Sequence, residues 1–197
     1  MKIVLVAVPG SGKTTIMSFV KKRLPDVQVI NYGDVMLEIA KRKYGIENRD
    51  EMRKKIPVEE YRKVQEEAAE YIAALPGDVI IDTHASIKMP TGYYPGLPDR
   101  VVAKLRPDAI VLIEYDPKDI VERRRGDPTR FRDAETEEEI ELHQLANRYY
   151  AFAAANAAEC TVNIISLRGR PQNRPFEHSE IAADIIVNMI LSSRKLK

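Results

Sequence analysis

The chain has 197 residues, 44% of them hydrophobic, which is enough to bury one sizeable core with small appended pieces. Its 31 basic and 30 acidic residues leave a formal net charge of +1, so the charge balance calls for no polyanionic partner such as nucleic acid. The single cysteine, Cys160, excludes an internal disulfide and favours a reducing, intracellular compartment, and no apolar run predicts a membrane span or a signal peptide.

Five short runs rich in valine and isoleucine are continuously apolar, as in strands buried on both faces of a parallel sheet. Longer segments with apolar residues at helical spacing separate them, which predicts an α/β fold: a three-layer, doubly wound, five-stranded parallel sheet. The predicted strands cover residues 2–7, 27–31, 78–83, 108–115 and 160–167. The predicted helices cover residues 13–24, 34–44, 49–55, 58–74, 98–105, 117–125, 135–157 and 178–193.

Two segments interrupt the alternation of strand and helix. Residues 32–76 place several helices between the second and third strands, and residues 126–134 form a polar, arginine-bearing break between two helices. A third segment, 169–179, contains two prolines and reads as a loop. Since no internal repeat is visible, we expect a single domain over residues 1–197.

The segment "AVPGSGKTT" follows the first predicted strand and nearly matches the phosphate-binding loop G-x-x-x-x-G-K-[ST]. Its glycines let backbone N–H groups from about Gly10 to Thr15 turn toward one point, and the following helix N-terminus completes an anion site. Lys13 would lie over the β- and γ-phosphates, and the Thr14 hydroxyl can bind Mg²⁺. The predicted nucleotide-binding residues are Ala7, Val8, Pro9, Gly10, Ser11, Gly12, Lys13, Thr14 and Thr15.

Ala7 stands where the motif has its first glycine. It lies at the end of the strand, before the turn tightens, so a methyl group is tolerated there provided that φ is below zero. We therefore expect the substitution to weaken the match to the motif more than the chemistry.

Asp82 ends the third predicted strand, where an aspartate of phosphate-loop proteins holds Mg²⁺ directly or through water. The alternative is a carboxylate that caps the next turn. His84, two residues on, is interpreted as a structural hydrogen-bonding residue.

Arginines cluster in "DIVERRRGDPTRFRD", after the fourth strand, and guanidinium donors placed there can stabilise a transferring phosphoryl group. Arg124 is interpreted as part of a solvated helix face. Arg148 lies on an otherwise apolar helix and needs an anion, either a substrate or a structural ion pair. Around the second helix, Gly33 permits close approach to the backbone and Asp34 can cap the helix that follows.

Together these segments resemble an adenylate kinase of the archaeal type over nearly the whole chain. The pieces that carry the resemblance are "AVPGSGKTT", "NYGDVML", "RDEMRK", "DTHASIKMPTGYYPGLP", "DPTRFRD" and "LHQLANR". The resemblance implies reversible, Mg²⁺-dependent transfer of the ATP γ-phosphoryl group to AMP, giving two ADP, in a cytoplasmic enzyme that is typically a trimer. It also implies a helical nucleotide-monophosphate arm at about 32–76 and a short lid at about 126–134, with neither nucleic acid nor a membrane as a partner.

The resemblance also implies roles for particular residues. Thr14 and Asp82 would hold the metal. The implied substrate-binding residues are Gly33, Asp34, Arg53, Asp82 and Lys88. The implied catalytic residues are Lys13, Arg123, Arg130, Arg132 and Arg148.

Three alternatives remain open at the level of sequence. The first is a related phosphate-loop kinase with another acceptor, and the second is an ATPase or RNA-associated switch. The third is a catalytically weakened relative that binds a nucleotide as a scaffold. An N-K-x-D motif, which would indicate a guanine-binding switch, is missing from the sequence.

Overall fold

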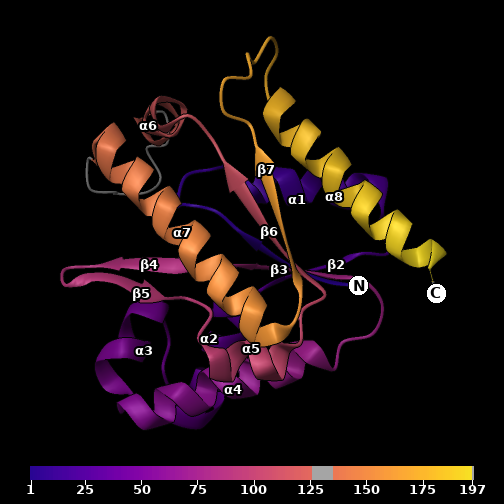
Figure 1. Ribbon diagram of the computed structural model, residues 1–197. Coiled ribbons are helices and arrows are strands. Elements are labelled where there is room, and N and C mark those ends of the chain that lie inside the picture. The colour runs from indigo at the N-terminus through magenta and orange to yellow at the C-terminus, as the bar shows by residue number, and fades with distance from the viewer. Residues whose placement is uncertain (126–134, 197) are drawn as a thin grey trace.

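Five parallel strands form the central sheet of the protein (Figure 1). The computed structural model describes residues 1–125 and 135–196, apart from the side chain of Asp50. The strand order is β2-β3-β1-β6-β7, which confirms the predicted doubly wound α/β fold. The strands are β1 (Lys2–Val6), β2 (Gln28–Asn31), β3 (Val79–Thr83), β6 (Ala109–Glu114) and β7 (Thr161–Ser166).

Helices cover both faces of the sheet, which explains why its inner strands β1, β3 and β6 are almost continuously apolar. Along β1, Ile3 and Leu5 belong to one buried cluster, whereas Val4 and Val6 belong to the other. The first cluster packs beneath α1 (Lys13–Arg23) and α8 (Glu177–Lys195), on one side of the sheet in Figure 1. The second packs against α2 (Tyr32–Tyr44), α4 (Val58–Ala73), α5 (Asp99–Leu105) and α7 (Glu137–Ala158). The remaining helices are α3 (Arg49–Lys55) and α6 (Pro117–Arg125).

The direction of the connections reverses next to β1. The chain leaves β1 through α1 and reaches β2, while the segment after β3 crosses to β6 on the opposite side of β1. In open α/β sheets ligands bind at such a switch point, beyond the carboxyl ends of the strands. The segment that follows β1 is the predicted phosphate loop, so the topology places this loop at the expected ligand crevice.

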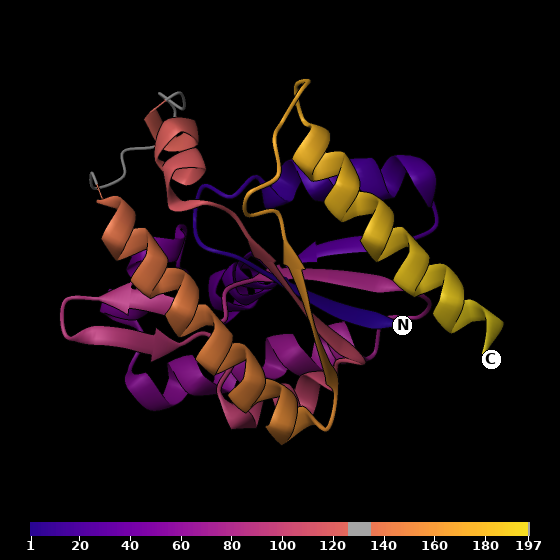
Figure 2. The same cartoon turned by 45° about the horizontal axis from the view of Figure 1, so that its top comes forward.

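An antiparallel hairpin, which the sequence did not predict, extends outside the sheet. Its strands β4 (Ser86–Met89) and β5 (Gly92–Pro95) lie beside α7 (Figure 2). The hairpin returns against its own base at Gly96, where an added Cβ would lie 2.0 Å from the backbone oxygen of His84. Glycine is therefore required where the hairpin rejoins the end of β3.

The second helix begins earlier than predicted, and Asp34 does not cap it. The side-chain oxygen of Asn31 accepts a hydrogen bond from the Asp34 N–H at 3.2 Å, so Asn31 is the N-cap and α2 starts at Tyr32. Asn31 already has the extended backbone of β2, which suits an N-cap residue. Asp34 lies instead in the first turn. None of the described helices has the length and apolar character needed to cross a membrane.

Candidate active site

The phosphate loop joins β1 to α1 and turns at two glycines. Gly10 has φ 89° and Gly12 has φ 82°, both in the left-handed region that favours glycine. Ala7 is buried, with 1% of its surface exposed, and is not among the described non-glycine residues with positive φ. The backbone condition for tolerating an alanine at this position is therefore met.

Some N–H groups of the loop form hydrogen bonds within the loop, and others have no acceptor among the described residues. The Ser11 N–H donates to the Val8 oxygen at 3.3 Å, and the Thr15 N–H donates to the Gly12 oxygen at 3.0 Å. The expected run of free donors from Gly10 to Thr15 is thus shorter than predicted. No acceptor for the N–H groups of Gly10 or Gly12 is found in the part of the chain that the structure describes.

Lys13 and Asp82 form the charged centre of the site. Lys13 Nζ lies 2.7 Å from Asp82 Oδ1 and also donates to the Thr83 oxygen. Asn31 Nδ2 donates to the other carboxylate oxygen of Asp82 at 2.9 Å. The side chains of Lys13 and Asp82 are only 10% and 15% exposed, and burial lowers the pKa of Lys13 while the Asp82 charge opposes that shift.

The oxygen atoms near this pair suit a magnesium ion. Thr14, in the first turn of α1, is exposed, and Asp82 offers a carboxylate at the tip of β3. Within residues 1–125 and 135–196 no group of three or more His, Cys, Asp or Glu side chains could hold a metal. Mg²⁺ does not require such a group, because it commonly takes one or two protein oxygens and completes its shell with water and substrate phosphates.

Two consecutive arginines at the end of α6 contact the phosphate loop. Arg123 Nη1 donates to the Ser11 oxygen at 3.4 Å, and its guanidinium carbon lies 4.1 Å from the ring centroid of Tyr115. Arg124 Nε and Nη2 both donate to the Pro9 oxygen, at 3.0 and 2.7 Å. The interpretation of Arg124 as a solvent-facing residue is therefore wrong, because the fold of α6 places its guanidinium against a loop more than a hundred positions earlier.

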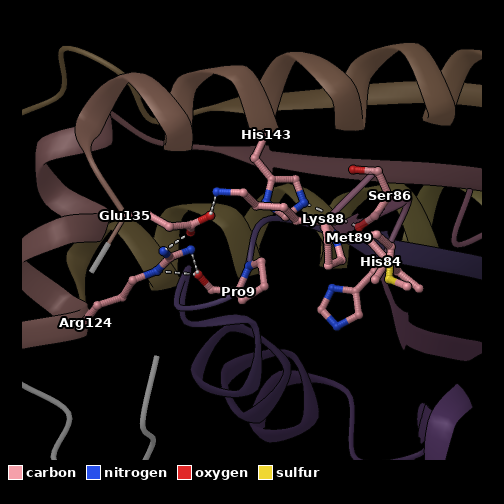
Figure 3. A pocket seen from close by; sticks show the side chains of 10 residues that line it. Pro9, His84, Ser86, Lys88, Met89, Arg124, Glu135 and His143 are labelled. Carbon is pink, nitrogen blue, oxygen red and sulfur yellow. Dashed lines mark hydrogen bonds and ion pairs between the residues drawn. The ribbon is translucent and has the colours of Figure 1, made fainter. Parts of the chain in front are cut away.

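A cavity of about 560 Å³ opens beside the loop (Figure 3). Its lining residues come from the phosphate loop, the end of β3, the hairpin, α6, α7 and the segment just before α7. They are Pro9, His84, Ser86, Ile87, Lys88, Met89, Pro90, Arg124, Glu135 and His143. Burial, helped by the Lys13 charge, lowers the pKa of His84 to about 4, so this imidazole is neutral at pH 7.

Polar residues of α7 form hydrogen bonds with the start of β4, which borders this cavity, and with the residue that follows β6. Asn147 Oδ1 accepts from both the N–H and the hydroxyl of Ser86, at 3.0 and 2.7 Å. The Gln144 amide accepts from the Tyr115 N–H and donates to its oxygen, both at 3.0 Å. The sequence did not predict these contacts, although the polar positions of "LHQLANR" recur on one helix face, which was the available signal.

Comparisons with known proteins identify the family. A relative from Pyrobaculum aerophilum described as "Adenylate kinase" is 72% identical over 195 residues, which cover 99% of this chain and 99% of the relative. The chain belongs to the adenylate kinase family. A second adenylate kinase, from Methanothermobacter thermautotrophicus, is 48% identical over 168 residues, covering 84% of this chain and 90% of that relative.

Broader comparisons agree with the observed α/β fold. The family model described as "AAA domain" matches residues 6–141. Shikimate kinase from Bacteroides thetaiotaomicron superposes with a TM-score of 0.59 at 15% identity, covering 97% of this chain and 98% of that one. Shikimate kinase from Aquifex aeolicus gives a TM-score of 0.55 at 18% identity, with coverages of 100% and 99%. Such low identities show the fold alone. The adenylate kinase relatives confirm the predicted enzyme class, a nucleoside monophosphate kinase.

Gly33 and Arg53 of this adenylate kinase family member lie in the region between β2 and β3. A Cβ at Gly33 would lie 3.0 Å from the Arg49 guanidinium carbon, so the close approach predicted there involves Arg49. That guanidinium donates to Asn31 at 2.7 Å and to Asp34 at 2.5 Å. Arg53 lies near the hairpin, with Nη1 at 3.8 Å from the sulfur of Met89.

The remaining predicted site residues separate into three groups. Lys88 lines the cavity and pairs with Glu135 at 2.8 Å and with Glu139 at 3.0 Å. Arg148 is not among the described residues that line the cavity; it pairs through Nε and Nη2 with the fully buried carboxylate of Glu114. Arg130 and Arg132 lie outside the residues that the structure describes.

Proposed function

We propose that this member of the adenylate kinase family transfers the γ-phosphoryl group of ATP to AMP, reversibly and with Mg²⁺, giving two ADP. The observation that carries the proposal is the joint presence of a phosphate loop and an adjoining cavity in a chain 72% identical to an adenylate kinase over 99% of its length. The loop supplies the site for one nucleotide, and the cavity gives an acceptor phosphate access to the same point.

The loop would bind the phosphates of ATP through its open N–H groups and through Lys13. In the nucleotide-free chain, Lys13 pairs with Asp82 at 2.7 Å, and bound phosphates would attract its ammonium group away from this carboxylate. Thr14 and Asp82 would hold Mg²⁺, which supplies charge neutralisation on the phosphate oxygens. Bound in this way, the γ-phosphoryl group would point toward the cavity.

The acceptor would be oriented by the segments around the cavity. We propose that Gly33, Asp34, Arg53 and Lys88 surround AMP, and that Arg123, Arg130 and Arg132 stabilise the charge on the transferring group. Transfer would be direct and in line, without a covalent intermediate, because positioning and electrostatics supply most of the rate in phosphoryl transfer. The arm over 32–76 would exclude water from the reacting phosphates, together with the predicted lid over 126–134, which lies outside the described residues.

The decisive experiment offers Mg-ATP with a panel of nucleoside monophosphates and measures diphosphate formation alongside free phosphate. We expect ADP formation that depends on AMP, with little free phosphate. Efficient transfer to another monophosphate would point to a related kinase with a different acceptor. Release of phosphate without any transfer would support an ATPase and contradict the proposal.

We further propose that the protein is a cytoplasmic homotrimer. Four large apolar side chains on α7 are exposed at spacings of three and four residues, which places them on one helix face. They are Leu142 (50% exposed), Leu145 (42%), Tyr149 (68%) and Phe152 (54%). Light scattering should show a trimer for the parent protein. The glutamate charge in Phe152→Glu should dissociate that trimer. A monomeric parent would contradict this proposal.

A further inference from the structure

Two arginines in the last turn of α6 hold carbonyl oxygens of the phosphate loop. Arg124 directs two N–H donors at the Pro9 oxygen, at 3.0 and 2.7 Å, and Arg123 reaches the Ser11 oxygen at 3.4 Å. Both acceptors belong to peptide groups that precede a glycine with positive φ, Gly10 and Gly12. Glycine peptides rotate easily, so these two are the least constrained of the loop unless something fixes them.

Fixing a carbonyl also fixes the neighbouring N–H. In a trans peptide the C=O and the N–H of the next residue point in opposite directions. With the Pro9 oxygen held against α6, the Gly10 N–H must point away from α6, and the same reasoning applies to Ser11 and Gly12. Neither N–H has an acceptor among the described residues, so both remain available to an anion.

Two linked ion pairs hold Arg124 in this position. Its Nη1 pairs with Glu135, which in turn accepts from Lys88 of the hairpin at 2.8 Å (Figure 3). The side chains of Arg124 and Glu135 are only 9% and 13% exposed. Burial would raise the pKa of Glu135, but its bonds to Lys88 and Arg124 outweigh that effect and lower the pKa, so the carboxylate stays charged.

We propose that Arg124 is a positioning residue of the phosphate loop: its hydrogen bonds to the Pro9 carbonyl orient the Gly10 N–H toward the bound phosphate, and Glu135 holds the guanidinium in place. The proposal deepens the proposed function and rests on it for the identity of the anion, a nucleoside triphosphate. All three guanidinium nitrogens, Nε, Nη1 and Nη2, already have partners within the protein, which favours positioning over direct contact with substrate.

The test compares four variants: Arg124→Ala, Arg124→Lys, Glu135→Gln and, as a matched control, Lys118→Ala. Lys118 is an exposed cation on the same helix, so its loss removes the same charge without touching the loop. Three quantities are measured: the amide resonances of Gly10 and Gly12 in the nucleotide-free protein, the dissociation constant of ATP with Mg²⁺ and no acceptor, and the thermal unfolding midpoint.

We expect Arg124→Ala to shift the Gly10 amide resonance in the free protein and to weaken ATP binding about 10- to 100-fold. Arg124→Lys, which can still donate to Pro9, should recover part of that loss. Glu135→Gln should give a smaller shift in the same direction, and Lys118→Ala should match the parent. Because Glu135→Gln preserves shape, it remains informative even where the alanine variant fails to fold.

Two results would overturn the proposal. Weaker ATP binding by Arg124→Ala with an unchanged Gly10 resonance would mean that Arg124 touches the nucleotide itself. Unchanged ATP binding in both Arg124 variants and in Glu135→Gln would mean that the contact between Arg124 and the Pro9 carbonyl is dispensable. Neither result depends on AMP, so a failure of the proposed transfer reaction would be recognised separately, by ATP binding without ADP formation.

Discussion

Charged pairs behave differently in two regions of this molecule. On α4, Lys63 pairs with Glu60 and Arg62 pairs with Glu59, and these side chains are between 37% and 75% exposed. At the carboxyl ends of the strands, Lys13 pairs with Asp82 and Arg124 with Glu135, and none of these side chains is more than 15% exposed. The same residue types therefore form a solvated surface in one place and a desolvated network in the other.

This difference in exposure indicates where ion pairs hold side chains in fixed positions. Exposed ion pairs contribute about 0–1 kcal/mol to stability, because water and salt screen them and long side chains lose freedom. Buried pairs gain little net stability over apolar residues, but breaking one leaves an unpaired charge and is costly. Lys13–Asp82 and Arg124–Glu135 lie at the phosphate loop, which is where a phosphoryl-transfer site needs fixed geometry. A further buried pair, between the amino-terminal ammonium group and Asp78, lies at the opposite end of β1.

The largest expected effect is on catalysis, from Lys13→Ala. Removing the ammonium group takes away a cation of the anion site and leaves Asp82 without its partner, so phosphoryl transfer should fall by at least about 10³-fold. Steady-state assays with Mg-ATP and AMP measure this, with the exposed Lys63→Ala as a charge-matched control at parental rate. Substantial activity in Lys13→Ala would show that the buried charges at the strand ends matter no more for catalysis than the exposed charges of α4.

Arg148→Met should act mainly on stability. It leaves the fully buried Glu114 with Arg168 alone, whose Nε lies 3.5 Å from the carboxylate. We expect a loss of about 2 kcal/mol in the free energy of unfolding, below the usual value for a broken buried pair because Arg168 remains. The double variant with Glu114→Gln should recover part of this loss in denaturant unfolding. A large fall in kcat at parental stability would instead support the catalytic role that the resemblance implied.

His84 should make stability depend on pH. Its pKa is about 4 in the folded chain and about 6.5 when unfolded, so below pH 6.5 the unfolded state binds a proton that the folded state does not. Stability contributed by neutral His84 is complete above pH 6.5 and is lost as the pH falls toward 4. The parent should therefore lose up to about 3 kcal/mol more than His84→Asn over this range. Parallel unfolding curves for the two proteins would show that His84 is not desolvated.

The smallest expected effect belongs to Ala7→Gly. Ala7 already has an acceptable backbone conformation, so restoring the motif glycine should change kcat by less than about threefold and cost about 0.5–1 kcal/mol of stability. Kinetics and thermal unfolding on the same preparation measure both effects. A hundredfold gain in turnover would show that the methyl group distorts the loop after all.

The sequence by itself determined the features that depend on short segments. The apolar runs specified five strands, and the order of strands and helices specified the doubly wound class. Burial on both faces holds for the inner strands β1, β3 and β6, whereas the edge strands β2 and β7 are half-exposed. The phosphate loop was equally clear, because Gly10, Gly12 and Lys13 act through their own backbone and spacing. The backbone conformation of Ala7, with φ outside the left-handed region, also followed from its place at the end of the first predicted strand.

Tertiary structure alone decided which charges meet. Arg124 and Pro9 are separated by 115 positions, and the two ends of the Arg148 pair by 34, so no local pattern identifies the partners of these arginines. The capping of α2 by Asn31 in place of Asp34 depended on where β2 ends, and the hairpin depended on a close approach at Gly96. Hydrogen bonds and ion pairs act over a few ångströms in space, whereas sequence periodicity reports only neighbours along the chain.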